Sequence, residues 1–234
     1  ERVQIYDDAA VKSFVGSYIP YYPMLDIDHP VTYGPLDGPE YYFEHKRAQI
    51  EGMRNARRVI QDVGAEFGQK FGRTYGMFDS YMMDDADVAI VVMSSTAGTA
   101  RYAMNTLRAQ GIRAGLIKPR VFRPFPGKEM CDALRNVKAV AVMDRSVSFG
   151  AEENGGPLWL ETLAAAHVHR LNIPIVDYVF GLGGREIKPS QIENVYRDLL
   201  AIAESGEFTQ PVTYLGVHGD EDYQSAAPRI LQTA

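Results

Sequence analysis

The sequence predicts an α/β protein: a doubly wound parallel sheet, preceded by a strap rich in proline and aromatic residues and by a long helix. Two patterns predict this class. After residue 84, short apolar runs alternate with amphipathic runs of helical period, and helices that cross back over a sheet make successive strands parallel. Before residue 76, a proline-rich stretch is followed by one helical pattern that is too long for a small domain. We therefore expect a strap and linker helix at 1–75, an α/β domain at 76–210 and a tail at 211–234.

The strap lies between residues 17 and 39. Proline lacks an amide hydrogen and restricts the residue before it, so the prolines of this stretch predict irregular, extended backbone. Aromatic residues between them favour a strap docked on a surface over a flexible linker, which would be rich in Gly and Ser. The residues that define the strap are Pro20, Pro23, Pro30, Pro35 and Pro39, with Tyr18, Tyr21, Tyr22 and Tyr33.

A long helix follows, because apolar residues recur every three or four positions over residues 50–71 and the pattern ends at Gly72. A helix of about 30 residues would be roughly 45 Å long, enough to connect two bodies. Gly52, Gly64 and Gly68 each weaken it by about 1 kcal/mol relative to alanine. Either packing holds this helix in one piece, or it breaks into two.

Four strand–helix units come next. The run Val88-Ala89-Ile90-Val91-Val92-Met93 is apolar throughout, as in a strand that is covered on both faces. The Ser and Thr residues at 94–96 can cap the helix after it, which stops at Gly111. Pro189 in the first turn and Gly206 at the end delimit the last helix. The expected strands are residues 88–93, 114–121, 139–143 and 173–180.

Composition excludes several classes of protein. The net charge of −6 argues against a nucleic-acid binder, which would concentrate Lys and Arg against phosphates. Cys131 is the single cysteine, so no disulfide can form within the chain, and we expect a cytoplasmic protein. No apolar run reaches the roughly 18 to 20 residues of a membrane-spanning helix. Because the sequence opens at Glu1 in the middle of a pattern, we expect further residues upstream.

Ligands of an open α/β sheet bind at the carboxyl ends of the strands, which singles out the loops there. Residues 94–98 open a helix whose amides could hold an anion, although an ordinary Ser/Thr cap is commoner. Asp144 could be a general base or a cofactor ligand. An ion pair with Arg145 or Arg123 is favoured, because no second carboxylate or histidine is near it in the sequence. Whether residues 94–98 or 144–150 contact a ligand stays open at this stage.

The remaining candidates favour structural roles. The glycines at 181–184 resemble a phosphate loop in composition but not in spacing, which favours tight turns. His167 and His169 are two apart on an expected helix, so they cannot bind one metal ion as an i, i+4 pair would. Cys131 has no histidine partner at a recognisable spacing, which favours a buried, inert thiol. An iron–sulfur cluster needs four thiolates, so any cluster must lie on another chain.

Several short segments between residues 71 and 187 occur in the order of one known family. They are Phe71-Gly72-Arg73-Thr74-Tyr75, Asp84-Asp85-Ala86-Asp87, Leu107-Arg108-Ala109-Gln110-Gly111, Met143-Asp144-Arg145 with Ser148-Phe149-Gly150, and Gly181-Leu182-Gly183-Gly184-Arg185-Glu186-Ile187. The most distinctive is Phe122-Arg123-Pro124-Phe125-Pro126, which follows a strand that begins near Gly115. Together they resemble the α subunit of 2-oxoacid:ferredoxin oxidoreductases, the thiamine-diphosphate enzymes best known from pyruvate:ferredoxin oxidoreductase.

This resemblance implies a transketolase-C-terminal-like domain, with residues 1–75 as the end of a preceding thiamine-binding domain. It implies oxidative decarboxylation of a 2-oxoacid, most often pyruvate, to acyl-CoA and CO2, with electrons passed to ferredoxin. Thiamine diphosphate, Mg2+ and [4Fe-4S] clusters would be bound elsewhere in the assembled enzyme. No catalytic, cofactor-binding or metal-ligating residue is therefore expected in this chain, which would support the assembly.

The resemblance also implies partners. They are the N-terminal thiamine-binding half of the α subunit and a β subunit, with γ and δ subunits as further candidates, and ferredoxin and coenzyme A for the whole complex. Neither nucleic acid nor a membrane is expected as a partner.

Two departures from the family stand out. Ser94-Ser95 replaces the usual Gly-Ser, and Pro119 interrupts a strand that normally continues. Two alternatives stay open: a subunit of another thiamine-diphosphate enzyme, such as a transketolase or a 2-oxoacid dehydrogenase β chain, and a non-catalytic assembly module. An assembled complex without iron would favour another thiamine-diphosphate enzyme.

Overall fold

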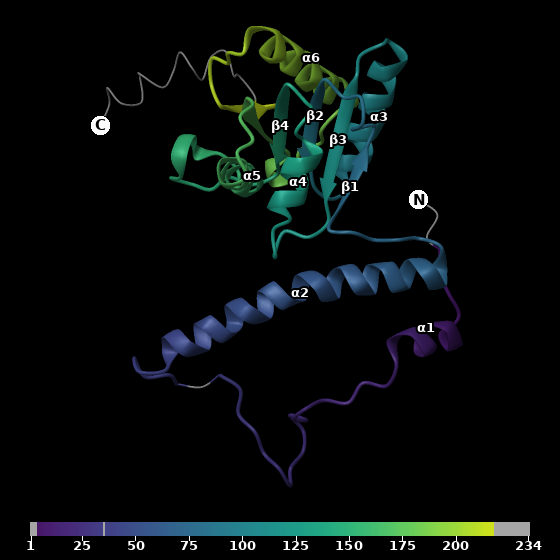
Figure 1. Cartoon of the computed structure of the whole chain (residues 1–234), viewed down its shortest axis with the longest axis vertical. Helices are drawn as coiled ribbons and strands as arrows, with labels where there is room; N and C mark the ends of the chain where they lie inside the picture. The colour runs from purple at the N-terminus through teal and green to yellow at the C-terminus, as the bar shows by residue number, and fades with distance from the viewer. Residues whose placement is uncertain (1–3, 35, 218–234) are drawn as a thin grey trace. The chain divides into compact units, whose positions relative to one another are not determined.

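The computed structural model describes residues 4–34 and 36–217 (Figure 1). The chain forms two compact units, Glu1–Ile50 and Glu51–Ala234. The division falls within helix α2, Tyr42–Phe71. Most of α2, from Glu51 onward, thus belongs to the same unit as the sheet.

The first unit holds helix α1, Asp8–Val15, and the strap. The side chain of Asp7 accepts a hydrogen bond of 2.8 Å from the amide of Ala10, and Gly16 ends the helix at φ 75°. From residue 16 to residue 41, the described chain contains neither helix nor strand, which confirms the irregular backbone that the prolines predict. Within the strap, the hydroxyl of Tyr33 donates to the carbonyl of Tyr22 at 2.6 Å.

Helix α2 is one uninterrupted helix of 30 residues, so its glycines do not break it. Two of them are explained by the chain that follows the helix. A Cβ atom on Gly64 would lie 1.8 Å from the carbonyl oxygen of Tyr75, and one on Gly68 would lie 2.2 Å from the Oγ1 of Thr74. Nothing lies within 4 Å of a Cβ on Gly52. Gly64 and Gly68 therefore permit a close approach between α2 and residues 74–75.

The sheet has six strands in the order β1-β3-β2-β4-β5-β6. The four predicted strands are present and parallel; three are one or two residues shorter than expected, and the third along the chain is one residue longer. They are β2, Val88–Val92; β3, Ala114–Pro119; β4, Ala139–Asp144; and β5, Ile175–Phe180. Pro119 is the last residue of β3, so it ends that strand. The predicted α/β class, with a mostly parallel sheet and a long helix before it, is confirmed.

Two edge strands were not predicted. Strand β1, Phe78–Tyr81, pairs antiparallel with β3, and β6, Val212–Leu215, pairs parallel with β5. Both contain only four residues, and β1, Phe78-Asp79-Ser80-Tyr81, lacks a regular alternation of apolar and polar side chains, so neither strand stands out in the sequence. The first residues of the predicted 211–234 tail therefore belong to the sheet.

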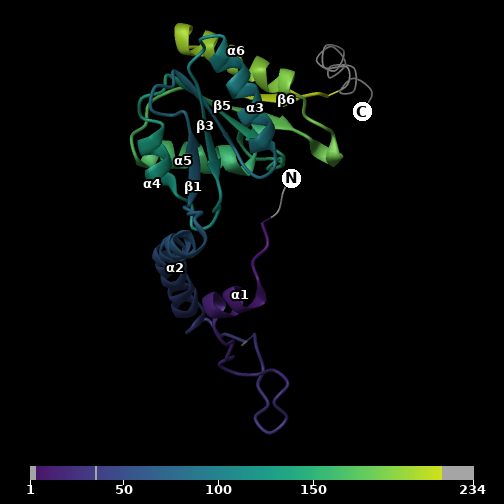
Figure 2. The same ribbon diagram turned by 90° about the vertical axis from the view of Figure 1, so that its right-hand side faces the viewer.

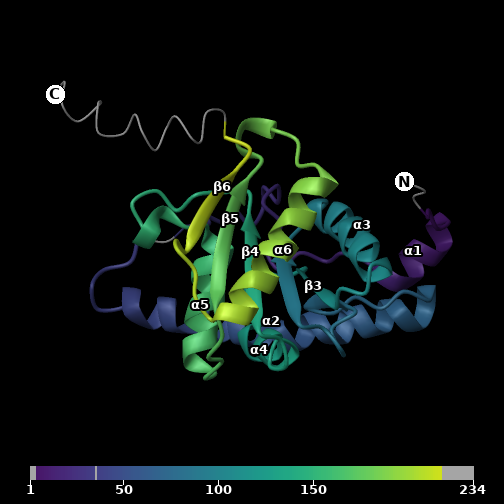
Figure 3. The ribbon, with the colours of Figure 1, turned by 90° about the horizontal axis from the view of Figure 1, so that it is seen from above.

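Two helices cover each face of the sheet (Figures 2 and 3). Helices α3, Thr96–Ala109, and α6, Pro189–Ser205, bury their apolar residues on one face, and the buried Tyr196 hydroxyl donates to the carbonyl of Gly115 at 2.9 Å. Helices α4, Gly127–Ala133, and α5, Pro157–Val168, cover the other face. Short 3₁₀ turns at Glu152–Asn154 and Leu182–Gly184 complete the elements.

The Phe122-Arg123-Pro124-Phe125-Pro126 turn forms a packed corner between β3 and α4. The rings of Phe122 and Phe125 meet edge to face with centroids 6.1 Å apart, and both pack on the buried cluster beneath α4 and α5. Arg57 of α2 donates to the carbonyl of Phe125 at 3.2 Å and pairs with Glu129 of α4. The corner thus joins the linker helix to the α/β domain.

We expect Phe125→Ala to lower the free energy of unfolding by about 3 kcal/mol, because it deletes an aromatic side chain from a packed corner. Chemical denaturation monitored by circular dichroism measures the change. Phe149→Ala is the matched control, since Phe149 is 97% exposed and its removal should change stability little. Equal stabilities of the two variants would show that the corner is not packed in solution.

A pair of substitutions in α2 tests the close approach to Tyr75. Alanine favours a helix over glycine by about 1 kcal/mol, so Gly52→Ala should stabilise the chain. Gly64→Ala should instead destabilise it by about 2 kcal/mol or more, because the new methyl group would overlap a backbone oxygen. Opposite shifts in melting temperature are expected. Stabilisation by both substitutions would mean that α2 does not contact residues 74–75.

Candidate functional site

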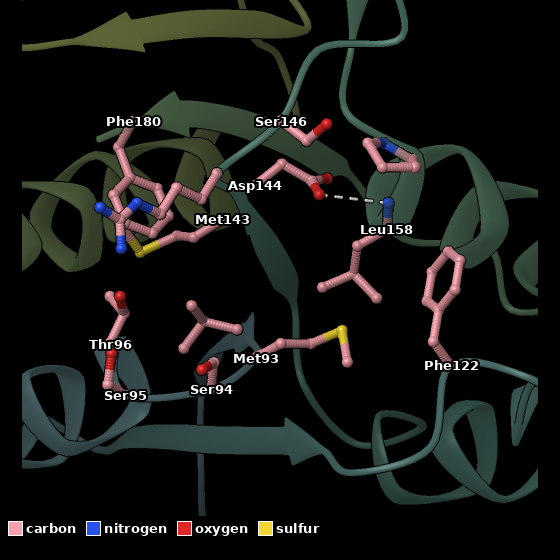
Figure 4. Close-up of a pocket in the computed structure, with 13 residues that line it drawn as sticks. Met93, Ser94, Ser95, Thr96, Phe122, Met143, Asp144, Ser146, Leu158 and Phe180 are labelled. Carbon is pink, nitrogen blue, oxygen red and sulfur yellow. Dashed lines mark hydrogen bonds between the residues drawn. The ribbon is translucent and has the colours of Figure 1, made fainter. Parts of the chain in front are cut away.

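A cavity of about 300 Å³ opens at the carboxyl ends of β2, β4 and β5 (Figure 4). The chain passes from β2 to β3 on one side of β2 and later to β4 on the other, so the cavity lies at the point where the strand order reverses. Open α/β sheets bind ligands at this point. The residues that line the cavity are Val92, Met93, Ser94, Ser95, Thr96, Phe122, Met143, Asp144, Arg145, Ser146, Pro157, Leu158 and Phe180.

The start of α3 forms one wall of the cavity. No Ser or Thr side chain makes a capping hydrogen bond there, so the ordinary cap expected from the sequence is wrong. The reason is backbone geometry: Ser94 has φ 61°, and Ser95 is already helical, so neither has the extended conformation of a capping residue. The left-handed conformation of Ser94 is one that glycine adopts freely, which explains the glycine that the resembling family usually has here.

Asp144 forms part of the opposite wall. It is 5% exposed, and its carboxylate accepts hydrogen bonds from the amides of Leu158 at 3.2 Å and Trp159 at 2.9 Å. The predicted ion pair is wrong, because Arg145 donates to the carbonyl of Gly181 and Arg123 pairs with Glu161. Asp144 therefore holds the first turn of α5, where unpaired amides favour a carboxylate.

Asp177, in the middle of β5, is a second buried carboxyl group that was not predicted as a candidate. It has no exposed surface, and its Oδ2 accepts a hydrogen bond of 2.7 Å from the amide of Gly156. Its Oδ1 has no partner among the described residues. The sequence could have indicated this buried carboxyl group, because Asp177 interrupts the otherwise apolar run Ile175-Val176-Asp177-Tyr178-Val179-Phe180.

The carboxyl groups of Asp144 and Asp177 both contact the turn at Gly156, just before α5. A Cβ atom on Gly156 would lie 2.1 Å from the carboxyl carbon of Asp144, while the Gly156 amide binds Asp177. Burial raises the pKa of Asp144, against the effect of its two amide donors. Burial, with the nearby Asp144 as a smaller cause, raises the pKa of Asp177 to about 7. The amino end of α5 thus rests on two carboxyl groups, one of which titrates near neutral pH.

The other candidates have structural environments. Gly181, Gly183 and Gly184 have φ values of 65°, 66° and 86°, as the tight-turn interpretation predicts. His167 is exposed on α5, and His169 follows that helix. Cys131 is buried, which raises the pKa of its thiol and disfavours the reactive thiolate.

The donor set of this chain does not fit an iron–sulfur cluster. The chain has one cysteine, whereas a [4Fe-4S] cluster takes four thiolates. Within residues 4–34 and 36–217, no three His, Cys, Asp or Glu side chains are grouped so that they could hold a metal ion. No helix in the same ranges is long and apolar enough to cross a membrane.

The pKa of Asp177 predicts a pH dependence of stability. A carboxyl group whose pKa is raised on folding stabilises the fold below its unfolded pKa, and this stabilisation is lost as the pH rises through the folded pKa. Unfolding free energy should therefore fall between about pH 4 and pH 7, by up to about 4 kcal/mol. Asp177→Asn removes the ionisation, so this variant should be more stable than the parent at pH 8, by a margin that narrows as the pH falls and disappears below about pH 4.

Trp159 provides the measurement, because it is the only tryptophan in the chain and its amide binds Asp144. Denaturation followed by its fluorescence at several pH values gives the two stability profiles. Asp62→Asn, on the surface of α2, is the matched control and should leave the profile of the parent unchanged. Parallel profiles for the parent and Asp177→Asn would contradict the assignment of the pH dependence to Asp177.

Comparisons with known proteins agree with this fold and with the motifs. The family described as pyruvate:ferredoxin oxidoreductase core domain II matches residues 86–192. Pyruvate synthase subunit PorA of Thermotoga maritima is 44% identical over 200 residues, which are 86% of this chain and 50% of that protein. Ketoisovalerate oxidoreductase subunit VorA of Pyrococcus abyssi is 35% identical over 215 residues, which are 92% of this chain and 54% of that protein.

One solved structure that resembles the chain is 2-oxoglutarate:ferredoxin oxidoreductase from Magnetococcus marinus, with 2-oxoglutarate, coenzyme A and succinyl-CoA bound. It is 21% identical with a TM-score of 0.44, over 71% of this chain and 24% of that one. The chain spans about half the length of the curated relatives it matches. Residues 86–192 form a pyruvate:ferredoxin oxidoreductase core domain II, and the chain is homologous to the PorA and VorA α subunits of the 2-oxoacid:ferredoxin oxidoreductase family.

Proposed function

We propose that this chain is the C-terminal half of the α subunit of a 2-oxoacid:ferredoxin oxidoreductase in the cytoplasm. The assembled enzyme would decarboxylate a 2-oxoacid oxidatively to acyl-CoA and CO2 and pass the electrons to ferredoxin. The observation that carries the proposal is the identity of 44% with a pyruvate synthase subunit over 86% of the chain. The match to core domain II over residues 86–192 supports it.

Pyruvate is the substrate that we propose. The pyruvate synthase subunit of Thermotoga maritima is 44% identical to this chain, and the ketoisovalerate oxidoreductase subunit of Pyrococcus abyssi is 35% identical. This choice of substrate rests on sequence identity alone, and not on the residues that line the cavity at the strand ends.

The chain's own role in the enzyme is structural. Thiamine diphosphate, Mg2+ and the [4Fe-4S] clusters would lie on the N-terminal half of the α subunit and on β, γ or δ subunits, and the cofactors perform the chemistry. The single buried cysteine supports this division, since one thiol cannot hold a cluster. The α/β domain would then serve as a rigid body onto which the catalytic domains assemble.

The strap supplies a surface for that assembly. In the first unit, large apolar side chains are exposed in numbers that a free surface rarely carries. Tyrosines and phenylalanines are enriched at the cores of protein interfaces, because rigid rings bury much area at a small entropic cost. The side chains are Tyr18, Ile19, Tyr21, Tyr22, Met24, Leu25, Ile27, Tyr33, Leu36, Tyr41, Tyr42 and Phe43. We propose that they pack on the N-terminal thiamine-binding half or on a β subunit.

Hydrogen exchange tests this interface. Amides of residues 17–58 should exchange more slowly in the assembled enzyme than in the chain alone, because partner contacts exclude water from the strap. Every residue of β2 is buried, so its amides provide the internal control and should be equally protected in both samples. Equal protection of residues 17–58 in both samples would show that the strap has no partner in the enzyme.

Activity of the assembly tests the function itself. The chain, tagged and purified from its native host under anaerobic conditions, should carry partners that reduce ferredoxin with pyruvate and coenzyme A, faster than with 2-oxoisovalerate. Iron and thiamine diphosphate should be present in the complex and absent from the chain after its partners are stripped away. A complex without iron would favour another thiamine-diphosphate enzyme, and faster turnover of 2-oxoisovalerate would overturn the choice of pyruvate.

A further inference from the structure

The cavity at the strand ends has hydrogen-bond donors that the fold leaves unused. Thr96 is only 8% exposed, yet its hydroxyl makes no hydrogen bond within the part of the chain that the structure describes. Figure 4 shows this hydroxyl on the cavity side of α3. The oxygen of this hydroxyl is not fully enclosed, so it is reachable from the cavity and can donate a hydrogen bond to a ligand there.

The amino end of α3 adds a positive electrostatic potential to the same wall. A helix of 14 residues concentrates about half a positive charge at its start, and α3 has neither an acidic residue in its first turn nor a side-chain cap to offset it. The hydroxyls of Ser94 and Ser95 lie beside Thr96 (Figure 4), and Arg145, whose Nε donates to the carbonyl of Gly181, is among the residues that line the cavity. These groups together would stabilise a negatively charged ligand group.

Asp144 limits where that group can lie. It is the one acidic side chain in the cavity wall, and Figure 4 shows it with Ser146 across the cavity from Ser94, Ser95 and Thr96. Its own charge is stabilised by the amides at the start of α5. An anion bound at the start of α3 would therefore lie on the wall opposite Asp144, with the cavity between them.

The rest of the cavity is apolar. Met93, Phe122 and Leu158 form the end that continues from α3 toward α5. A volume of about 300 Å³ is at the small end of the range for ligand sites, so it suits a compact molecule.

We infer that this cavity binds a small organic anion, with a carboxylate or phosphate group at the start of α3 and an apolar body against Met93, Phe122 and Leu158. The inference does not depend on the proposed function, because it rests on the geometry of this chain alone.

Three probes test the inference on the full 234-residue chain: phenyl phosphate, 3-phenylpropionate and inorganic phosphate. Calorimetry should show saturable binding of at least one aromatic anion and much weaker binding of inorganic phosphate. Amide resonances of Ser95 and Thr96 should shift on binding in NMR spectra. Tighter binding of phenyl phosphate or of 3-phenylpropionate then distinguishes a phosphate ligand from a carboxylate ligand.

Thr96→Val removes the unpaired hydroxyl at constant shape and should weaken binding about tenfold. Thr106→Val is the matched control on the same helix, because that hydroxyl bonds to the carbonyl of Tyr102 and does not line the cavity. Binding to this control should equal binding to the parent.

Ser95→Asp provides a second, independent variant. It places a carboxylate at the start of α3, which should raise the melting temperature and abolish binding of the anions. Any of four results would overturn the inference. The first two are Thr96→Val binding a probe as tightly as the parent does and Ser95→Asp still binding the anions. The other two are inorganic phosphate binding as tightly as the aromatic anions and no probe binding saturably.

Discussion

The amino end of helix α5 rests on two buried carboxyl groups, and much of the domain depends on that support. Asp144 and Asp177 lie on adjacent strands, and between them they accept the amides of Gly156, Leu158 and Trp159. Burying two acids side by side is unfavourable unless their charges are reduced or hydrogen-bonded. The turn at the start of α5 provides those hydrogen bonds, so helix and sheet stabilise each other at this point.

The same contacts fix the geometry of the cavity. Pro157 and Leu158 belong to the first turn of α5 and also line the cavity, so the carboxyl groups that hold this turn determine the cavity wall. The facing wall, at the start of α3, has the opposite character, since no side chain caps it. At the end of β4, Asp144 thus places a carboxyl group against the amino end of α5. At the end of the neighbouring β2, no side chain caps the amino end of α3.

The sequence was most informative where burial dictates residue type. Strands such as β2 were predictable because both faces are covered, and every residue must then be apolar. The strand β1 was not, because an edge strand of four residues leaves too short a pattern. Asp144 was paired with the wrong group, since the sequence suggested a basic partner, the adjacent Arg145 or Arg123, whereas its partners are amides 14 and 15 residues further on. Such contacts exist only after the chain has folded.

Strand β6 has a consequence for where this domain ends. The amide of Asp177 donates to the carbonyl of Pro211 at 2.7 Å, and Val212 is buried against the core. A chain cut at residue 210 would leave β5 as an edge strand, with its backbone donors and acceptors unpaired along an apolar segment. Strands of that kind recruit copies of themselves, so residues 211–215 protect the domain from aggregation as much as they extend its sheet.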